Sequence, residues 1–114
     1  MYAQITYFDG PRSPEVVAAA HRAGRERISP ALLADAEVMA DHVATYVLDG
    51  PDGGQVVVAI ATSQSSLDRA VEVILSTELL PGEDPALLAE PDRVQRMTVV
   101  HAIENGRVVE DVTV

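Results

Sequence analysis

The stretch Tyr46–Ala61, with the sequence YVLDGPDGGQVVVAIA, decides how this chain folds. Its Gly, Pro and Asp residues predict a short turn that joins two antiparallel strands, His42–Asp49 and Gln55–Thr62. A strand with one face in water alternates apolar and polar residues, yet the run from Val56 to Ala61 is apolar throughout. We therefore expect the second strand of this pair to be covered on both faces.

The residues before this pair predict one strand and a helical region. Tyr2–Phe8 is rich in β-branched and aromatic residues, and a turn signal follows it. Ser13-Pro14 has the chemistry of a helix N-terminus. The serine side chain can accept a hydrogen bond from a free amide of the first turn, and the proline has no amide proton that would need a partner there. Ser29-Pro30 repeats this pattern, so we expect a second capped helix to begin there.

The residues after the pair predict a long helix, a fourth strand and a hairpin. Ser65 followed by Asp68 resembles a capping box at the start of the helix. Val94–Ile103 has the composition of a strand. Asn105-Gly106 is a strong hairpin signal, so Arg107–Val114 is expected to fold back as a short fifth strand.

The resulting element order is β-α-β-β-α-β, which predicts an α+β, ferredoxin-like fold in a single domain over residues 1–114. Right-handed crossovers place both helical regions on one face of a four-stranded antiparallel sheet. PALLAD at Pro30–Asp35 and PALLAE at Pro85–Glu90 each follow a helix and precede a strand, as an internal duplication would produce. Ala and Leu are common in this chain, so a coincidence remains the alternative.

This fold leaves one sheet face without a cover from its own chain. Val94, Val100 and Ala102 lie in one phase of the fourth strand and Met97 and Val99 in the other, so this strand is also apolar on both sides. Leaving several hundred Å² of such a face in water would forgo on the order of 10 kcal/mol. We expect a homodimer in which the two sheets cover each other.

The composition argues against several classes of partner. The formal net charge is −10, so the phosphate contacts that dominate nucleic-acid affinity are scarce, and an anionic membrane is an equally poor partner. The N-terminal residues show no basic segment followed by an apolar run, and no stretch approaches a membrane span of about 20 apolar residues, so we expect a cytoplasmic protein. The chain has no cysteine, which excludes disulfides and thiolate chemistry.

The segments ISPALLAD, TYVLDGPDGG and STELLPGEDPALL, together with the element order and the two-sided strands, resemble the dimeric α+β barrel superfamily. Within it, they resemble small actinobacterial proteins related to the antibiotic biosynthesis monooxygenases. The resemblance implies sheet-to-sheet dimers with a pocket between each sheet and its own helices. It also implies cofactor-independent oxidation of a small aromatic or apolar molecule. The active members use a pocket Asn and Trp; this chain has no Trp, and its Asn105 lies in the expected turn.

Oxygenation without a cofactor needs a base, a polar group that stabilises the substrate anion, and an apolar cavity. His21 falls on the apolar face of the first helix, where it would line such a pocket, and we take it as the candidate base. Tyr7 and Tyr46, in the first and second strands, are the candidates to complete a polar pair with it. The alternatives are a packed or half-exposed histidine and tyrosines at a sheet edge or interface.

The other polar candidates have simpler interpretations. His42 suits a surface position, and His101 suits the core or an interface. Arg12, Arg22, Arg25 and Arg27 would either hold an anion or form a solvated face with an Arg22–Glu26 pair. No zinc-type spacing occurs, so we expect neither a metal nor a cofactor.

Three functions remain open at this point. The first is a monooxygenase-like enzyme, and the second is a non-catalytic, ligand-binding or accessory dimer. The third is a regulatory amino-acid-binding module, which usually accompanies another domain. A pocket with an inward-facing His or Tyr favours the enzyme, whereas a space filled by Leu, Val and Ile favours the accessory dimer.

Overall fold

The computed structural model describes residues 1–110 and 112, and its centre is a four-stranded antiparallel sheet. The strands are β1 (Tyr2–Phe8), β2 (His42–Asp49), β3 (Gln55–Ala61) and β4 (Arg93–Thr98), in the spatial order β2-β3-β1-β4. The α+β class and the four-stranded antiparallel sheet are confirmed. β3 lies inside the sheet, between β2 and β1, as the apolar run in this strand predicts.

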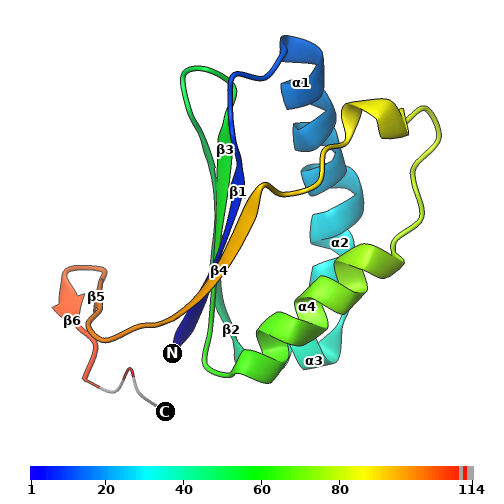
Figure 1. The fold of residues 1–114 in the computed structure, drawn as a ribbon. Helices are drawn as coiled ribbons and strands as arrows, with labels where there is room; N and C mark the ends of the chain where they lie inside the picture. The colour runs from blue at the N-terminus through cyan, green and yellow to red at the C-terminus, as the bar shows by residue number, and fades with distance from the viewer. Residues whose placement is uncertain (111, 113–114) are drawn as a thin grey trace.

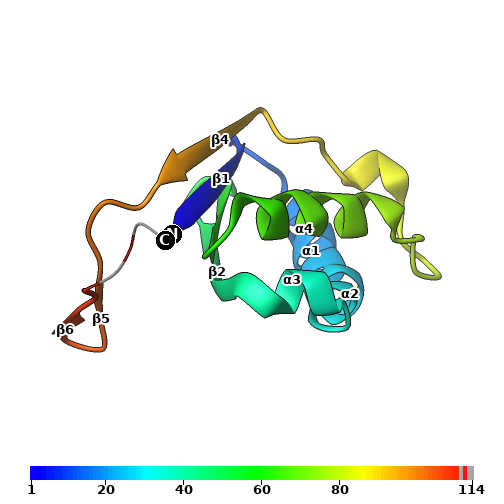
Figure 2. The ribbon, with the colours of Figure 1, turned by 90° about the horizontal axis from the view of Figure 1, so that it is seen from below.

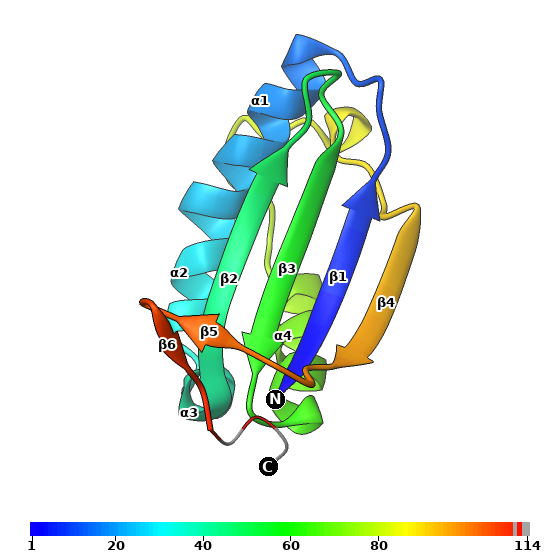
Figure 3. The ribbon, with the colours of Figure 1, turned by 90° about the vertical axis from the view of Figure 1, so that its left-hand side faces the viewer.

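The helices cover only one face of this sheet, and no helix of the described residues lies on the opposite face (Figures 1 and 2). The register of the strand pairs gives the side chains on the uncovered face: Ala3, Ile5 and Tyr7 of β1; Ala44, Tyr46 and Leu48 of β2; Val56, Val58 and Ile60 of β3; and Arg93, Gln95 and Met97 of β4. None of these side chains is acidic, although the chain has 18 Asp and Glu residues. We call this surface the open face; Figure 3 views it directly.

The first helical region is continuous from Pro14 to Leu33. It consists of α1 (Pro14–Arg22), the π-helical segment η1 (Ala23–Ile28) and α2 (Ser29–Leu33). Ser13 caps α1 as expected, its Oγ accepting a hydrogen bond from the Val16 amide at 3.3 Å. The expected capped restart at Ser29-Pro30 is wrong, because Ile28 and Ser29 both have helical backbone angles and no side chain caps α2. Pro30, which has no amide to donate, directly follows the π-helical segment, where the hydrogen-bond pattern of the helix changes.

The helical region ends after Leu33, and a new helix, α3 (Ala36–Asp41), follows. Asp35 caps α3, its side chain accepting from the Val38 amide at 3.0 Å. α4 (Gln64–Ser76) follows β3 and packs against α3. Its cap is Ser63, whose Oγ accepts from the Ser66 amide at 3.2 Å, so the expected capping box at Ser65 is two residues too late. The small core lies in this region, with Val38, Ala61, Leu67 and Val73 among its buried residues.

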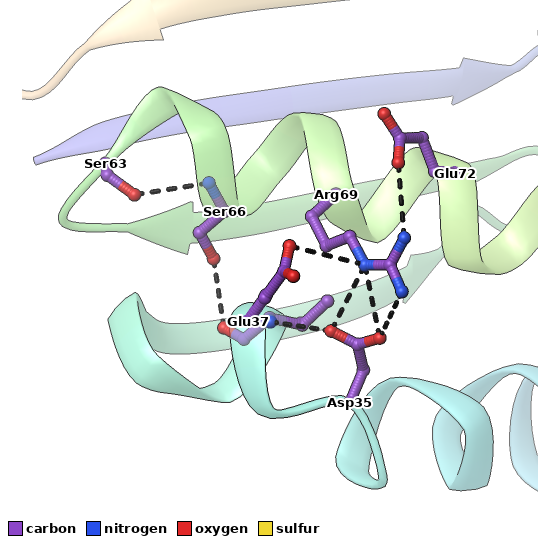
Figure 4. Close-up of polar contacts among 7 residues, drawn as sticks. Asp35, Glu37, Ser63, Ser66, Arg69 and Glu72 are labelled. Atoms are coloured by element: carbon purple, nitrogen blue, oxygen red, sulfur yellow. Dashed lines mark hydrogen bonds and ion pairs between the residues drawn. The ribbon is translucent and has the colours of Figure 1, made fainter.

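Polar contacts fasten α3 to α4 beside this core (Figure 4). The Arg69 guanidinium donates to the Asp35 carboxylate, with Nη2 and Oδ2 separated by 2.8 Å. Arg69 also meets Glu37 at 3.7 Å and Glu72 at 3.3 Å. On the other side of the pair, the buried Ser66 hydroxyl donates to the Val38 carbonyl at 2.9 Å. Asp35 therefore both starts α3 and ties it to the following helix.

The last third of the chain departs further from expectation. A 3-10 turn, η2 (Pro85–Leu87), occupies part of the second PALLA segment. β4 ends at Thr98 rather than Ile103, because its partner β1 begins at Tyr2, which pairs with Thr98. The predicted hairpin is present as β5 (Ile103–Glu104) and β6 (Arg107–Val108), with positive φ at Asn105 and Gly106. The expected fifth strand is therefore shorter, and residues 111, 113 and 114 lie outside the described residues.

Replacing Asp35 by Asn tests the ion pair without removing the cap, because Asn also caps helices well. The hydrogen bonds from Arg69 lower the pKa of Asp35 from its ordinary 3.8. A carboxyl whose pKa is lower in the folded state stabilises the fold above its unfolded pKa, and this contribution disappears as pH falls through the folded value. We expect Asp35→Asn to lower the urea midpoint at pH 7 and to have a progressively smaller effect below pH 4.

The control for this prediction is Glu72→Gln, since Glu72 is more than half exposed and contributes one contact to the same guanidinium. We expect the urea midpoint of Glu72→Gln to match that of the unmodified protein at pH 7 and at pH 2. An Asp35→Asn effect that stays constant between pH 7 and pH 2 would show that the charge of Asp35 contributes nothing.

Candidate functional site

A surface hollow of about 490 Å³ lies where the start of α1 meets the turn between β2 and β3. These two segments come together at one end of the molecule (Figures 1 and 3). The hollow is lined by Arg12, Pro14, Val17, Ala18, His21 and the residues from Asp49 to Gly53. It is open to solvent, so it is a cleft rather than an enclosed chamber between sheet and helices.

The β2–β3 turn is fixed against the segment that precedes α1. The Arg12 amide donates to the Asp52 carbonyl at 2.9 Å, and Arg12 Nε donates to the Gly53 carbonyl at 2.7 Å. Gly53 has a φ of +87°, and a Cβ atom built on it would lie 2.5 Å from the Arg12 carbonyl oxygen. Only glycine fits at this position, so the turn glycines of the sequence set the shape of the hollow.

His21 and Asp49 form the polar centre of the hollow. His21 Nε2 lies 2.6 Å from Asp49 Oδ2, and the two side chains are 35% and 40% exposed. Gln55 Nε2 approaches the other oxygen, Asp49 Oδ1, at 3.4 Å. A contact this short to a carboxylate requires a proton on Nε2, so in the neutral ring Nδ1 carries the lone pair. The pair can therefore accept a proton at Nδ1, with Asp49 holding the ring orientation.

Arg12 and an apolar wall also line the hollow. Arg12 is held by its contacts with the turn, and its guanidinium carbon lies 5.5 Å from the centre of the Phe8 ring. Within the described residues, Arg12 Nη2 is buried and has no hydrogen-bond partner. Pro14, Val17 and Ala18 provide apolar lining. His21, Arg12 and an apolar surface thus line the same hollow.

Tyr7 and Tyr46 do not join His21 at this site. Both lie on the open face, whereas Asp49, the partner of His21, belongs to the opposite phase of β2. The Tyr7 hydroxyl donates to Gln95 Oε1 at 3.1 Å, and the Arg93 guanidinium stacks 4.0 Å from the ring centre. Tyr46 is 56% exposed. The structure therefore separates the three residues that the sequence suggested as one cluster, and a catalytic role for any of them stays a prediction.

Arg22 and Arg27 serve the helical layer rather than the hollow. Arg22 pairs with Glu26 at 2.8 Å, which is the contact expected from their i,i+4 spacing. Arg27 is half buried and donates to Glu83 at 2.8 Å and to Thr77 Oγ1 at 2.7 Å. The hydrogen bond from Arg27 lowers the pKa of Glu83. Both contacts of Arg27 hold the loop after α4 against η1.

Other histidines lie away from this site. His42 is exposed at the start of β2, where its Nε2 lies 3.0 Å from Thr45 Oγ1. His101 is exposed beyond the end of β4. Among residues 1–110 and 112, no group of three or more His, Asp or Glu side chains is arranged to hold a metal ion. No helix in the same residues is long and apolar enough to cross a membrane.

Asp49 is the residue of the hollow that sequence reasoning missed. It stands before Gly50-Pro51, where aspartate is a common turn residue, so the sequence offered an ordinary explanation for it. The useful signal was its position at the end of a strand whose turn must return toward the first helix.

Comparison of the chain with protein-family models, with curated proteins and with solved structures gave no match.

Replacing Gly53 by Ala tests whether this turn is locked to the residues before α1. We expect Gly53→Ala to lower the free energy of unfolding by about 2 to 4 kcal/mol, because the left-handed backbone strain adds to a clash with the Arg12 carbonyl. Gly106→Ala is a matched control, since Gly106 has a φ of +75° and open space around it. If chemical unfolding shows that both variants lose the same free energy of unfolding, the contact between Gly53 and the Arg12 carbonyl contributes nothing to stability.

Proposed function

We propose that this protein is a homodimer of ferredoxin-like subunits that binds a small aromatic hydroxy compound in the hollow beside α1. His21 acts there as the proton acceptor and Asp49 orients it. The observation that carries this proposal is the 2.6 Å contact between His21 Nε2 and Asp49 Oδ2 at the mouth of the hollow. A carboxylate that fixes one ring nitrogen leaves the other nitrogen as a directed base.

The lining of the hollow supports this class of ligand. Pro14 and Val17 offer apolar contact to a ring, His21 offers a place for its hydroxyl proton, and Arg12 supplies positive charge near the anion that results. Formation of such an anion is also the step that cofactor-independent oxidation of an aromatic molecule requires first. The resemblance to the antibiotic biosynthesis monooxygenases suggests the same chemistry, and it extends to a dimeric α+β barrel assembly.

The open face supports the homodimer. Its side chains are mainly apolar and include Arg93 as their one charged member, whereas the whole chain carries a net charge of −10. Two copies of so acidic a protein repel each other through most surfaces, and the open face avoids that repulsion. A twofold pairing of two open faces covers the apolar surface of both copies at once.

A non-catalytic, ligand-binding or accessory dimer is the second candidate function. The observation that favours it is that the hollow is open at the rim, while the space between sheet and helices contains buried Val38, Leu67 and Val73. In that case the dimer forms as proposed, and His21 and Asp49 serve to attach α1 to the end of β2.

The ligand site is tested with 2-naphthol, which has an acidic hydroxyl, and with 2-methoxynaphthalene, which has none. We expect 2-naphthol to bind at least tenfold more tightly by calorimetry, and His21→Gln to remove this preference, because glutamine does not accept the proton. His42→Gln is the matched control and should leave both affinities unchanged. Equal affinities for the two probes, or a preference that survives in His21→Gln, would refute the proton-acceptor role and leave the accessory dimer.

The dimer is tested by placing a carboxylate on each face of β3. Val58 belongs to the open face, so Val58→Asp should yield a folded monomer with an unfolding free energy close to that expected for an isolated subunit. Val57 lies in the opposite phase, toward the helices, so Val57→Asp should instead destabilise each subunit by more than about 2 kcal/mol. Sedimentation and chemical unfolding measure the two effects. A monomeric mass for the unmodified protein at micromolar concentration would contradict the proposed assembly.

A further inference from the structure

Four positions in the chain have an aspartate or asparagine directly before a glycine: Asp9-Gly10, Asp49-Gly50, Asp52-Gly53 and Asn105-Gly106. At such a pair the glycine amide nitrogen can attack the side-chain carbonyl carbon of the residue before it, because glycine has no Cβ atom that obstructs the approach. An amide carbonyl is a better electrophile than an ionised carboxylate, and asparagine is among the thermolabile residues of proteins. Asn105, which is the only asparagine of the chain, is therefore the most reactive of the four by its chemistry.

Two of the aspartate pairs lie in the β2–β3 turn, and the contacts of this turn restrain them. The Asp49 carboxylate is held by its contact in the hollow, and the Gly50 amide donates to the Gly54 carbonyl at 2.8 Å. Asp52 Oδ1 accepts from the Gly54 amide at 2.9 Å. The Gly53 amide donates to the Gly50 carbonyl at 3.2 Å. Because the attacking nitrogens and the carboxylates are both engaged, ring closure at these pairs requires hydrogen bonds of the fold to break first.

The first pair, Asp9-Gly10, is restrained by its surroundings. The Asp9 amide donates to Asp92 Oδ2 at 2.7 Å. A Cβ atom built on Gly10 would lie 2.5 Å from the Asp52 carboxyl carbon, so the main chain at this glycine is closely packed. All three aspartate pairs therefore stand in parts of the fold that resist the change of main-chain angles needed for ring closure.

The Asn105-Gly106 pair lies in a much less restrained place. It forms the two-residue turn of the β5–β6 hairpin, with φ values of 52° and 75°, and both residues are exposed. A Cβ atom built on Gly106 would meet no described atom within 4 Å. The hairpin consists of two residue pairs and stands beyond the sheet, opposite to the helices (Figures 1 and 2). Hairpins this short are marginally stable, so the turn opens far more readily than the rest of the fold.

We propose that Asn105 is a site of spontaneous deamidation in the folded protein. The Gly106 nitrogen attacks Asn105 Cγ, a new C–N bond closes a succinimide ring, and the side-chain nitrogen leaves as ammonia with the proton that Gly106 gives up. Water then adds to one of the two ring carbonyls and opens the ring. The product is aspartate or its isomer isoaspartate, in which the main chain runs through Cβ and Cγ. The reaction requires neither the ligand nor the second copy of the proposed function.

Either product changes the hairpin. Isoaspartate adds one carbon atom to the main chain of a two-residue turn, whose geometry depends on positive φ at both residues. The pairing of Glu104 with Arg107 across the turn then loses its register. Aspartate keeps the main chain but puts a second carboxylate beside Glu104. The hairpin therefore has a lifetime that is set by the chemistry of its own turn.

Peptide mapping by mass spectrometry tests the site in the unmodified protein during incubation at pH 8. Two synthetic peptides, AIENGRVV (residues 102–109) and VLDGPDGGQV (residues 47–56), give the rates without the fold. We expect Asn105 to gain about 1 Da in the protein at a rate within about tenfold of the peptide rate. Asp49 and Asp52 should form isoaspartate at least about tenfold more slowly in the protein than in the peptide. A slower reaction at Asn105, or aspartates that the fold does not slow, would overturn the proposal.

Two glycine variants show whether the reaction proceeds by this ring closure. Gly106→Ala puts a methyl group next to the attacking nitrogen, so we expect deamidation of Asn105 to slow at least about tenfold. Gly82→Ala is the matched control, because Gly82 also has a positive φ but follows Pro81, and it should leave the rate unchanged. Equal rates in Gly106→Ala and in the unmodified protein would show direct hydrolysis of the side chain and overturn the proposed mechanism.

Hydrogen exchange measures the effect on the hairpin. The Val109 amide donates to the Ala102 carbonyl at 2.8 Å at the base of the hairpin. In the isoaspartate fraction, separated by anion exchange, we expect this amide to exchange at least about tenfold faster than in the unmodified fraction. The Thr62 amide, which donates to the Asp41 carbonyl at 2.8 Å, is the matched control and should exchange equally in both. Unchanged exchange at Val109 would refute the effect on the hairpin.

Discussion

The pairing of β1 with two strands that come much later in the chain is the interaction on which the structure depends. β1 contacts β3 over seven residue pairs and β4 over six, so the first strand holds the two halves of the chain together. One helical region leads from β1 to β2 and the other from β3 to β4, and right-handed crossovers put both regions on the same side of the sheet. The open face, the hollow at one end and the β5–β6 hairpin at the other all follow from this arrangement.

Much of the fold could be predicted because its signals are local. Strand composition and turn residues identified β1, β2 and β3 to within one residue, and Asn105-Gly106 located the hairpin. The errors depend on contacts between distant residues. β4 is shorter than its composition suggests because β1 has no residues left to pair with it. Ser29 resembles a cap in the sequence, but packing of the helical layer continues the helix through it.

The candidate site was less predictable for a related reason. Whether a strand residue faces the helices or the open face depends on register, and a shift of one residue reverses it. The sequence placed Tyr7 and Tyr46 in strands correctly but could not give their side of the sheet. His21 was selected from helical spacing, which holds over the first turns of α1. Its partner Asp49 is 28 residues away and required the path of the turn to be known.

The number of residues in the π-helical segment Ala23–Ile28 affects the direction in which the Arg27 side chain points. Its wide turn, closed by a bond from the Ser29 amide to the Gly24 carbonyl, holds one residue more than an α-helical turn. Each residue turns a helix by about 100°, so the residues beyond this point face a different way than a regular helix would give. Arg27, inside this segment, pairs with Glu83 at 2.8 Å, which holds the loop after α4 against the helix. A chain one residue shorter here would present another side chain to that loop, which makes a single insertion or deletion a direct way to change this surface.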